Sequence, residues 1–487
     1  MRKATTERRR PDDATATTRS RASPARVRVQ VAAIGLGALM SALTQTLVVP
    51  VLPKLAVELH TTAGAAQWLL TSTLLVAAVS VPIIGRLADM FGRRLLLLCC
   101  LGILAAGSLL DALTSNLALM IVGRALSGVA SAAIPLGISL LTAVLPRERT
   151  GSAVALISAM LGIGSALGLP LAGVIADSAD YHVLFWIIAG GAVASFVAII
   201  GLVPEPATDA GGRLDWSGTV LLCAGVTALM LPLSKGSSWG WASVGTIGLF
   251  VLAAILVVAL VMVERRSDNP LLDLDRLARR PIVLTNLSSL LIGFALFSSF
   301  VGTSSYVQAP TTTGYGFGSS ILVAGLCLLP MGVLMLLLAP VAAQSIARWG
   351  AHRTLAAAAA VITLGLLFRI LFTDSLWQVI VGTAIIGAGS GVSYSSLPSL
   401  INANTPPNEL ASTNGVNSLA RFLGSSLSSA IGGSLLAAIT VTVGGIAFPS
   451  LTGYRVLFAI CAVASVLVVV AALSIPPRRP AATATDS

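Results

Sequence analysis

Fourteen apolar runs, each long enough to cross a bilayer, constrain the fold of this chain more than any other feature. Of its 487 residues, 56% are hydrophobic and only 10% are charged, and about 20 apolar residues suffice for one spanning helix. The sequence therefore predicts an all-α polytopic membrane protein with fourteen spans. The runs lie at 29–50, 67–84, 95–113, 118–143, 153–175, 183–203, 216–234, 244–263, 282–303, 320–338, 354–372, 377–398, 411–436 and 454–475.

The distribution of basic residues predicts the topology. An even number of spans leaves both termini on one side, and most Lys and Arg residues then fall on that side, as the positive-inside rule requires of cytoplasmic loops. The opposite side holds few cations: Lys54, Lys235, Arg369 and Arg455. We expect residues 1–28 and 476–487 to be cytoplasmic tails, the first disordered and basic, and the protein to lie in a bacterial plasma membrane. The net charge of +11 flanks apolar runs, so no nucleic-acid partner is expected.

Residues with reactive side chains are scattered. The five cysteines lie within apolar runs and the three histidines in separate loops, which predicts neither a disulfide framework nor a metal site. No nucleophile and base are spaced for catalysis, so we expect no enzyme and no cofactor. No glycine-rich loop ends in Gly-Lys-Ser/Thr, which excludes direct use of ATP through that motif.

A charged turn between the second and third runs carries the most specific signal. It fixes one carboxylate, Asp89, between Gly85 and Gly92 and follows it with Arg93 and Arg94. An ordinary basic loop is the alternative, but such a loop does not require this arrangement. The pattern resembles the signature between helices two and three of the major facilitator superfamily. That resemblance implies a transporter in which Asp89 meets the start of span 13 in the outward-open state. We further expect Arg93 and Arg94 to serve mainly as topology and lipid-headgroup anchors, with Asp89 holding one of them by a charge-assisted bond.

An internal repeat supports the same architecture. At an offset of 261 residues, Gly128 matches Gly389, Pro146 matches Pro407 and Glu148 matches Glu409. We therefore predict a six-helix half at 29–203, a linker with two extra spans at 204–281 and a second six-helix half at 282–475. The fourteen spans resemble the drug:proton antiporter branch of the superfamily, in which Asp215 to Gly218 and Glu264 to Arg266 match expected features.

Polar residues in spans 1 and 4 predict a shared site in the first half. Arg124 lies in the membrane on span 4, level with Thr44 and Gln45 on span 1 at 1.5 Å per residue. The resemblance ties this arginine to proton coupling, although Ser127 stands where glutamine is usual and Thr44 where an aspartate is usual. Alternatively, Arg124 extends its side chain to the outer interface.

Span 5 contains several glycines and a proline at short intervals. Gly164, Gly168, Pro170 and Gly173 allow close helix approach and a bend, and they resemble the antiporter motif of the family with its proline displaced by one position. A packing helix without a transport role is the alternative.

The second half places Arg421 near the midplane of span 13, one turn from Asn417, while Tyr394 lies among serines on span 12. These polar groups either form bonds between helices or line a cavity. Neither Arg124 nor Arg421 has an evident embedded counter-ion, so a neutral or anionic amphiphile suits the interior better than a cation does.

These features together predict a secondary active exporter of a hydrophobic or amphiphilic small molecule, such as a drug, antibiotic or secondary metabolite. Its partners are that substrate, protons and membrane lipid, and it works by alternating access. An importer or facilitator on the same fold, and a receptor or scaffold that does not transport, are the alternatives.

Overall fold

Helices make up nearly all of the structure, a computed structural model that describes residues 24–145, 147–178, 180–206, 215–267, 271–444 and 446–476. The tails before residue 24 and after 476 lie outside the described residues, as do Pro146 and the side chain of Glu148. The first helices are α1 (Pro24–Thr46), α2 (Val48–Glu58), α3 (Ala63–Ala66), α4 (Trp68–Phe91), α5 (Arg93–Leu113), α6 (Leu117–Val129), η2 (Ala130–Ala132), α7 (Ala133–Val144), α8 (Arg147–Ser178) and α9 (His182–Leu202). Next come α10 (Trp216–Trp239), α11 (Val244–Glu264) and α12 (Leu274–Leu277). The last helices are α13 (Arg280–Gln308), η3 (Thr311–Thr313), α14 (Ile321–Leu337), α15 (Ala339–Trp349), α16 (Ala351–Leu371), α17 (Leu376–Asn404), η4 (Pro407–Glu409), α18 (Leu410–Ala438) and α19 (Leu451–Leu473).

Helix is the expected state of such apolar segments, because each backbone group is then bonded within its own segment and none faces lipid unpaired. Side chains cap several helix starts. The carboxylate of Asp215 accepts from the N–H of Gly218 at 3.0 Å, and the hydroxyl of Ser243 accepts from the N–H of Thr246 at 3.2 Å. The second cap explains why α11 begins directly after its short loop.

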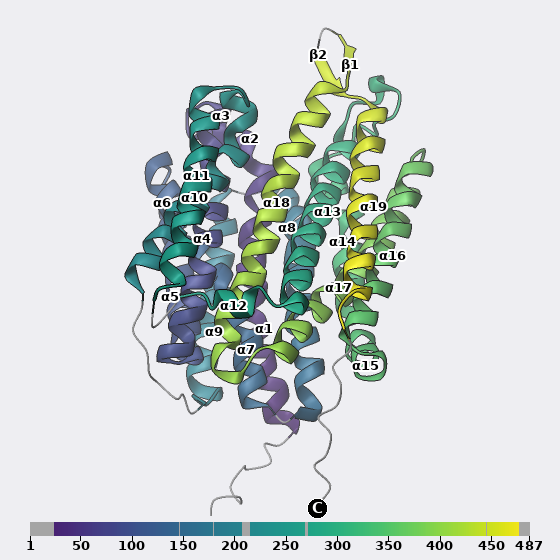
Figure 1. The fold of residues 1–487 in the computed structure, drawn as a ribbon. Coiled ribbons are helices and arrows are strands. Elements are labelled where there is room, and N and C mark those ends of the chain that lie inside the picture. The colour runs from purple at the N-terminus through teal and green to yellow at the C-terminus, as the bar shows by residue number, and fades with distance from the viewer. Residues whose placement is uncertain are drawn as a thin grey trace, which may run out of the picture.

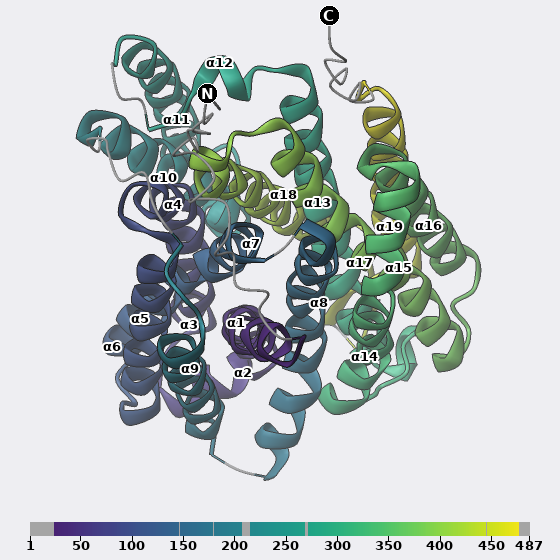
Figure 2. The ribbon, with the colours of Figure 1, turned by 90° about the horizontal axis from the view of Figure 1, so that it is seen from below.

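The helices form two groups that meet along a central plane (Figures 1 and 2). One apolar core draws most of its residues from α1 to α11, and the other from α13 to α19. Two seams join the groups, α4 against α18 and α8 against α14, while α10 packs beside the first seam and against α11. Helix α1 begins and α19 ends at the lower end of Figure 1, which we call the terminal face. The opposite end is the hairpin face.

Each of the fourteen predicted spans coincides with a helical segment, but the count of fourteen is not confirmed. Twelve described helices are long and apolar enough to cross a membrane, and α14 with α15, bent by 46°, makes a thirteenth if the pair is one span. The remaining segment, α18, is too polar to qualify. It carries serine, threonine and asparagine along its length.

One short hairpin departs from the all-α prediction. Strands β1 (Thr440–Val443) and β2 (Ile446–Pro449) pair antiparallel at the hairpin face, with Thr440 opposite Pro449. Gly444, at a φ of 59°, begins the turn. Alternating Thr and Val beside glycine is a hairpin pattern, and the prediction of fourteen helices did not consider it.

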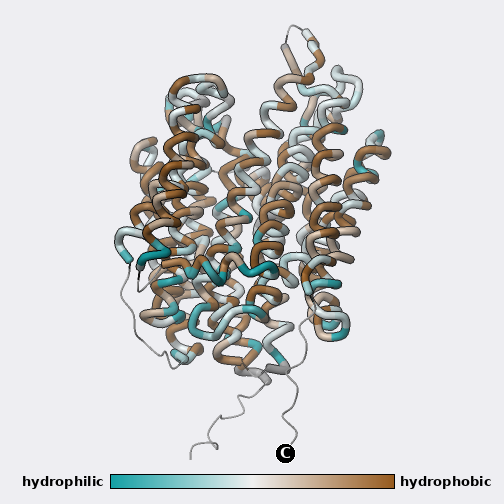
Figure 3. Tube along the Cα trace, in the orientation of Figure 1, coloured by the Kyte–Doolittle hydropathy of each residue, from teal (hydrophilic) through white to brown (hydrophobic). Residues whose placement is uncertain are grey.

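The surface fits a lipid environment. In Figure 3 the outer helices are coloured mainly as hydrophobic along their lengths, and hydrophilic residues gather toward the terminal face. Helix α11 shows this most clearly, since Ile255 is 59% exposed and Val258 57% exposed. Exposed apolar surface on this scale is typical of a surface that lipid or another protein covers.

The α8–α14 seam depends on glycine. A Cβ atom at Gly325 would lie 2.5 Å from the backbone nitrogen of Pro170, and one at Gly173 would lie 2.8 Å from the backbone of Leu322. Small residues let helix backbones come this close in membranes. The two helices are therefore in backbone contact near the hairpin face.

Replacing Gly325 by valine should destabilise the protein, because its branched side chain would overlap backbone atoms that cannot move aside. Overpacking of this kind costs about 1–3 kcal/mol. Gly190→Val is a matched control, since a Cβ at Gly190 meets nothing within 4 Å. Thermal unfolding in detergent should show a lower Tm for Gly325→Val alone. An unchanged Tm for that variant would contradict the close seam.

Candidate functional site

A polar contact closes the α4–α18 seam at the terminal face. Asp89, in the last turn of α4, accepts hydrogen bonds from the backbone N–H groups of Ala411 at 3.2 Å and Ser412 at 2.8 Å. These N–H groups belong to the first turn of α18, where they have no partner within the helix and carry partial positive charge. The predicted meeting of Asp89 with the start of span 13 is confirmed as a contact.

Glycines bring the two helices together at this place. A Cβ at Gly85 would lie 2.5 Å from the carbonyl oxygen of Ala411, and one at Gly415 would lie 2.9 Å from that of Val81. Gly92 serves a different purpose. Its φ of 111° lies in the left-handed region that side chains disfavour, and it turns the chain from α4 into α5.

Arg93 belongs to the same contact. Its guanidinium donates to Asp89 Oδ1 at 3.3 Å and to the carbonyl of Ser139 at 3.2 Å, and it also donates to the carbonyl of Pro407. The side chain thus joins α4, α7 and η4, and the residue is only 7% exposed. The prediction that Arg93 anchors lipid headgroups is therefore wrong, although the predicted bond to Asp89 is present. Arg94 is partly exposed and donates to the carbonyl of Ile200 at 2.7 Å.

A second ion pair lies beside this contact and was not predicted. Arg276 of α12 contacts Glu409 at 2.8 Å and Asp273 at 3.1 Å, so the segment before α13 is joined to the start of α18. Burial raises the pKa of the Glu409 carboxyl, and the Arg276 guanidinium opposes that rise. The sequence marked Glu409 only as a repeat partner of Glu148, because no local pattern links it to Arg276.

Arg124 lies inside the first helix group and does not reach the interface. It is 1% exposed, and its guanidinium donates to the carbonyls of Thr44 at 2.6 Å and Leu69 at 3.4 Å. The predicted alignment with Thr44 is confirmed, and the alternative of a side chain extending to the interface is not. Asp111, fully buried on α5, interacts electrostatically with Arg124. The expectation that no acidic residue lies near Arg124 inside the helix group is therefore wrong, although the two side chains form no salt bridge.

The polar side chains near Arg124 have fewer hydrogen-bond partners than Arg124 itself. Ser127 is fully buried, and its hydroxyl has no partner among the described residues, as is true of the Thr44 hydroxyl. Gln45 is partly exposed and donates weakly to Ser131 at 3.5 Å.

The second group places Arg421 beside Tyr394, while the Asn417 side chain, one turn away on α18, bonds to α13. The Arg421 guanidinium lies 5.4 Å from the ring centre of Tyr394, within range of a cation–π interaction, and Tyr394 packs against both apolar cores. Among the described residues, Arg421 is in no salt bridge. Asn417 instead donates to Asn286 at 3.0 Å and to Ser289 at 2.7 Å, so it bonds α18 to α13.

The four small residues predicted on span 5 divide between two partners. Cβ atoms at Gly164 and Gly168 would collide with Ala42 and Thr46 of α1. Pro170 and Gly173 face α14, as described above. Helix α8 is therefore held between α1 and α14, which confirms the expected close approach of helices. The resemblance of these residues to an antiporter motif stays a prediction.

Arg369 is a buried arginine of the second group, although the sequence predicted it to lie in an outer loop or at an outer helix end. Arg369 is fully buried, and none of its three guanidinium nitrogens has a hydrogen-bond partner among the described residues. It lies 5.3 Å from the ring of Tyr306 and 5.2 Å from that of Phe458. A charge inside an apolar run was the available signal.

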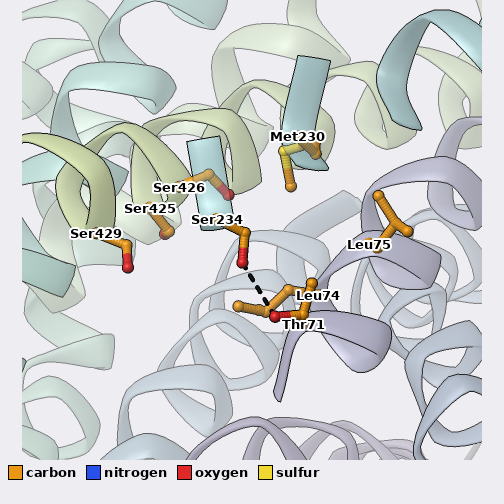
Figure 4. Close-up of a pocket in the computed structure, with 8 residues that line it drawn as sticks. All are labelled: Thr71, Leu74, Leu75, Met230, Ser234, Ser425, Ser426 and Ser429. Carbon is orange, nitrogen blue, oxygen red and sulfur yellow. Dashed lines mark hydrogen bonds between the residues drawn. The ribbon is translucent and has the colours of Figure 1, made fainter. Parts of the chain in front are cut away.

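A small cavity opens in the α4–α18 seam on the hairpin side of the Asp89 contact (Figure 4). Thr71 of α4 bonds Ser234 of α10 at 3.0 Å, and Ser425, Ser426 and Ser429 of α18 line the other wall. The seam is thus closed by backbone contact at one end and lined by hydroxyls at the other. No group of three or more His, Cys, Asp or Glu residues in the described part of the chain is placed to hold a metal ion.

The family model "Major Facilitator Superfamily" matches residues 34–429, so the chain belongs to that family. It is a multi-pass membrane protein of a family of transporters.

Two bacterial proteins and one solved structure show what the chain is similar to. The chain is similar to Multidrug resistance protein Stp of Mycobacterium tuberculosis, 28% identical over 83% of this chain and 75% of that protein. It is also similar to Tetracenomycin C resistance and export protein of Streptomyces glaucescens, 27% identical over 83% and 75%. The fold is that of the human organic anion transporter MFSD10 (TETRAN), with a TM-score of 0.62, 16% identity and coverage of 91% of this chain and 99% of that one.

Arg94→Lys should leave the terminal face closed, whereas Arg93→Lys should open it. One ammonium cannot reach the three acceptors that the Arg93 fork joins, and a hydrogen bond to a charged group contributes about 1.5–3 kcal/mol. The measurement is the labelling rate of Thr413→Cys, a position 5% exposed, by a thiol reagent, with the five native cysteines replaced. Arg93→Lys should raise the rate about as much as Arg93→Ala does, whereas equal rates in all three arginine variants would refute this role.

Proposed function

We propose that this protein is a secondary active exporter of hydrophobic or amphiphilic small molecules, coupled to protons and working by alternating access. The relatives named for multidrug resistance and for tetracenomycin C resistance and export support the direction and the substrate class. The proposal includes a plasma-membrane location, a cytoplasmic terminal face, two six-helix halves at 29–203 and 282–475, and α18 as a fourteenth span.

The Asp89 contact is the observation that carries this proposal. Hydrogen bonds from Ala411 and Ser412 to a carboxylate at the edge of the membrane can be exchanged for bonds to water, whereas a continuous apolar interface cannot open so readily. A polar contact between helix groups is therefore a reversible closure of one face. A receptor or scaffold that does not transport has no need of it.

The charge of the interior supports a neutral or anionic substrate. Arg421 lies beside Tyr394 between the two apolar cores and has no carboxylate partner among the described residues. A cationic compound would add to that positive charge, whereas an anionic amphiphile would offset it with its charged group and pack its apolar part against the aromatic ring.

Proton coupling supplies the energy in this proposal. One proton moving down 100 mV releases about 2.3 kcal/mol, enough for about 50-fold accumulation if one proton moves per substrate.

Transport into inside-out vesicles tests the proposal. The panel is a cation such as ethidium, a neutral amphiphile and an anionic amphiphile, measured without ATP and with an imposed proton gradient. We expect uptake of the neutral or anionic compound that an uncoupler abolishes. Uptake that runs only in right-side-out vesicles would instead indicate an importer, and no transport of any compound would favour the receptor or scaffold.

Substitution of Arg421 tests the substrate charge in the same assay. Arg421→Ala should reduce transport of the anionic compound more than that of the neutral one, because the compensating charge is lost. Arg348→Ala is the control, since Arg348 is exposed on α15 at the terminal face. Strong export of the cation that Arg421→Ala leaves unchanged would contradict the assignment.

A further inference from the structure

An acidic and a basic side chain, Asp111 and Arg124, are buried next to each other in the first helix group without a hydrogen bond between them. Asp111 is fully buried, and neither of its carboxylate oxygens has a hydrogen-bond partner among the described residues. Arg124 is 1% exposed, and its Nη1 also has no such partner. The two interact electrostatically, but their nitrogen and oxygen atoms are not within the 4.0 Å of a salt bridge.

A glycine creates the space for the carboxylate. A Cβ at Gly123, the residue before Arg124, would lie 2.1 Å from Asp111 Oδ1. Helices α5 and α6 touch here as well, because a Cβ at Gly107 would lie 2.6 Å from the carbonyl oxygen of Gly123. The carboxylate therefore lies between the two helices, directly beside the backbone that carries the arginine.

Arg124 is the one charge that faces Asp111 from the helices packed against α5. Helix α7 and η2 have no titratable residue. On α4, Arg86 and Asp89 lie at the terminal face, the opposite end from Asp111. The start of α9 contributes His182, preceded by Asp180 and Tyr181, but His182 and Tyr181 contact Ser115 beyond the end of α5, and Asp180 bonds His182.

An ionised carboxylate without hydrogen bonds is costly in this setting, and protonation removes that cost. The charge of Asp111 then decides which acceptor Arg124 prefers. When Asp111 is neutral, the guanidinium stays on the carbonyls of Thr44 and Leu69, as in the structure. When Asp111 is ionised, its carboxylate competes for the guanidinium and draws it away from α1 and α4.

We propose that Asp111 is the proton-binding residue of this transporter and that Arg124 transmits its charge to α1 and α4. The inference rests on the proton coupling in the proposed function. A proton from the hairpin side adds to a carboxylate oxygen, and after the change of access it leaves to water on the terminal side. Helix α4 carries Leu69 near one end and Asp89 near the other, so displacement of Arg124 acts on the helix that closes the terminal face.

The test uses purified protein in liposomes, with the compound that gives the largest gradient-driven uptake. Asp111→Asn fixes the neutral state, so the accumulation ratio of about 50 calculated above should fall to about 1. Exchange of labelled for unlabelled compound without a gradient should continue. Asp111→Glu should retain accumulation with a shifted pH dependence, and Asp180→Asn, an exposed acid at the same face, should behave as wild type.

Infrared difference spectra give a readout that does not depend on transport. Wild type should show a protonated-carboxyl band that titrates with pH and is missing in Asp111→Asn. Gradient-driven accumulation by Asp111→Asn at the wild-type ratio would overturn the proposal. If Asp111→Asn also loses exchange, the infrared measurement decides. A wild-type spectrum without the titrating carboxyl band would then overturn the proposal.

Failure of Asp111 as the proton site and failure of proton coupling in the proposed function can be told apart. If wild type transports but ignores the proton gradient, proton coupling in the proposed function fails, and the presence or absence of the titrating band then supports or overturns Asp111 as a proton site. Gly123→Ala adds an independent check, because the methyl group would displace the carboxylate. It should lower the accumulation ratio while Gly190→Ala, which meets no neighbour, leaves the ratio unchanged.

Discussion

The hydrogen bonds between a single carboxylate and the start of a helix join the two helix groups at the terminal face, and the proposed closure of that face depends on them. Asp89 and the backbone N–H groups of α18 that donate to it lie more than 300 residues apart in the chain, so these hydrogen bonds join the two helix groups directly. The free N–H groups of Ala411 and Ser412 compensate the partly buried charge, and the Arg93 guanidinium adds a second source of compensation. Removing the carboxylate, the N–H groups or the guanidinium would leave the remaining polar groups without hydrogen-bond partners, so the arrangement is cooperative.

The two seams between the helix groups differ in a way that suits a rocking motion. At the α8–α14 seam, glycines bring backbones into contact near the hairpin face, and such a surface can pivot without breaking bonds. The α4–α18 seam combines a polar contact at the terminal face with serine and threonine hydroxyls around a small cavity further along. Hydroxyls can exchange partners with water as the seam opens.

Sequence patterns predicted those features that depend on local order. Apolar runs located the long helices. Two glycines around one aspartate carried the family resemblance that implied the Asp89 contact. Composition alone did not decide the number of spans, since α18 is polar on its packed faces and resembles a soluble helix by hydropathy.

Features that depend on distant partners were beyond the sequence. A pair of arginines gives the same sequence pattern whether the side chains face lipid or protein. The inward position of Arg93 could therefore be seen only in the fold. The Arg276–Glu409 pair joins segments with no common pattern, and the isolation of Arg369 among aromatic rings depends on three helices. Asp111 was visible as a charge in an apolar run, but only packing at Gly123 shows that it lies beside Arg124.

Distances across the two faces test the central claim most directly. Spin labels at Phe91 and Trp349 report on the terminal face, and labels at Val57 and Trp377 report on the hairpin face; all four side chains are exposed. Pulsed electron paramagnetic resonance should show one short terminal-face distance in the wild-type protein without substrate. In Asp89→Asn a longer terminal-face population should appear while the hairpin-face distance shortens. Identical distributions in wild type and Asp89→Asn at both faces would contradict the account.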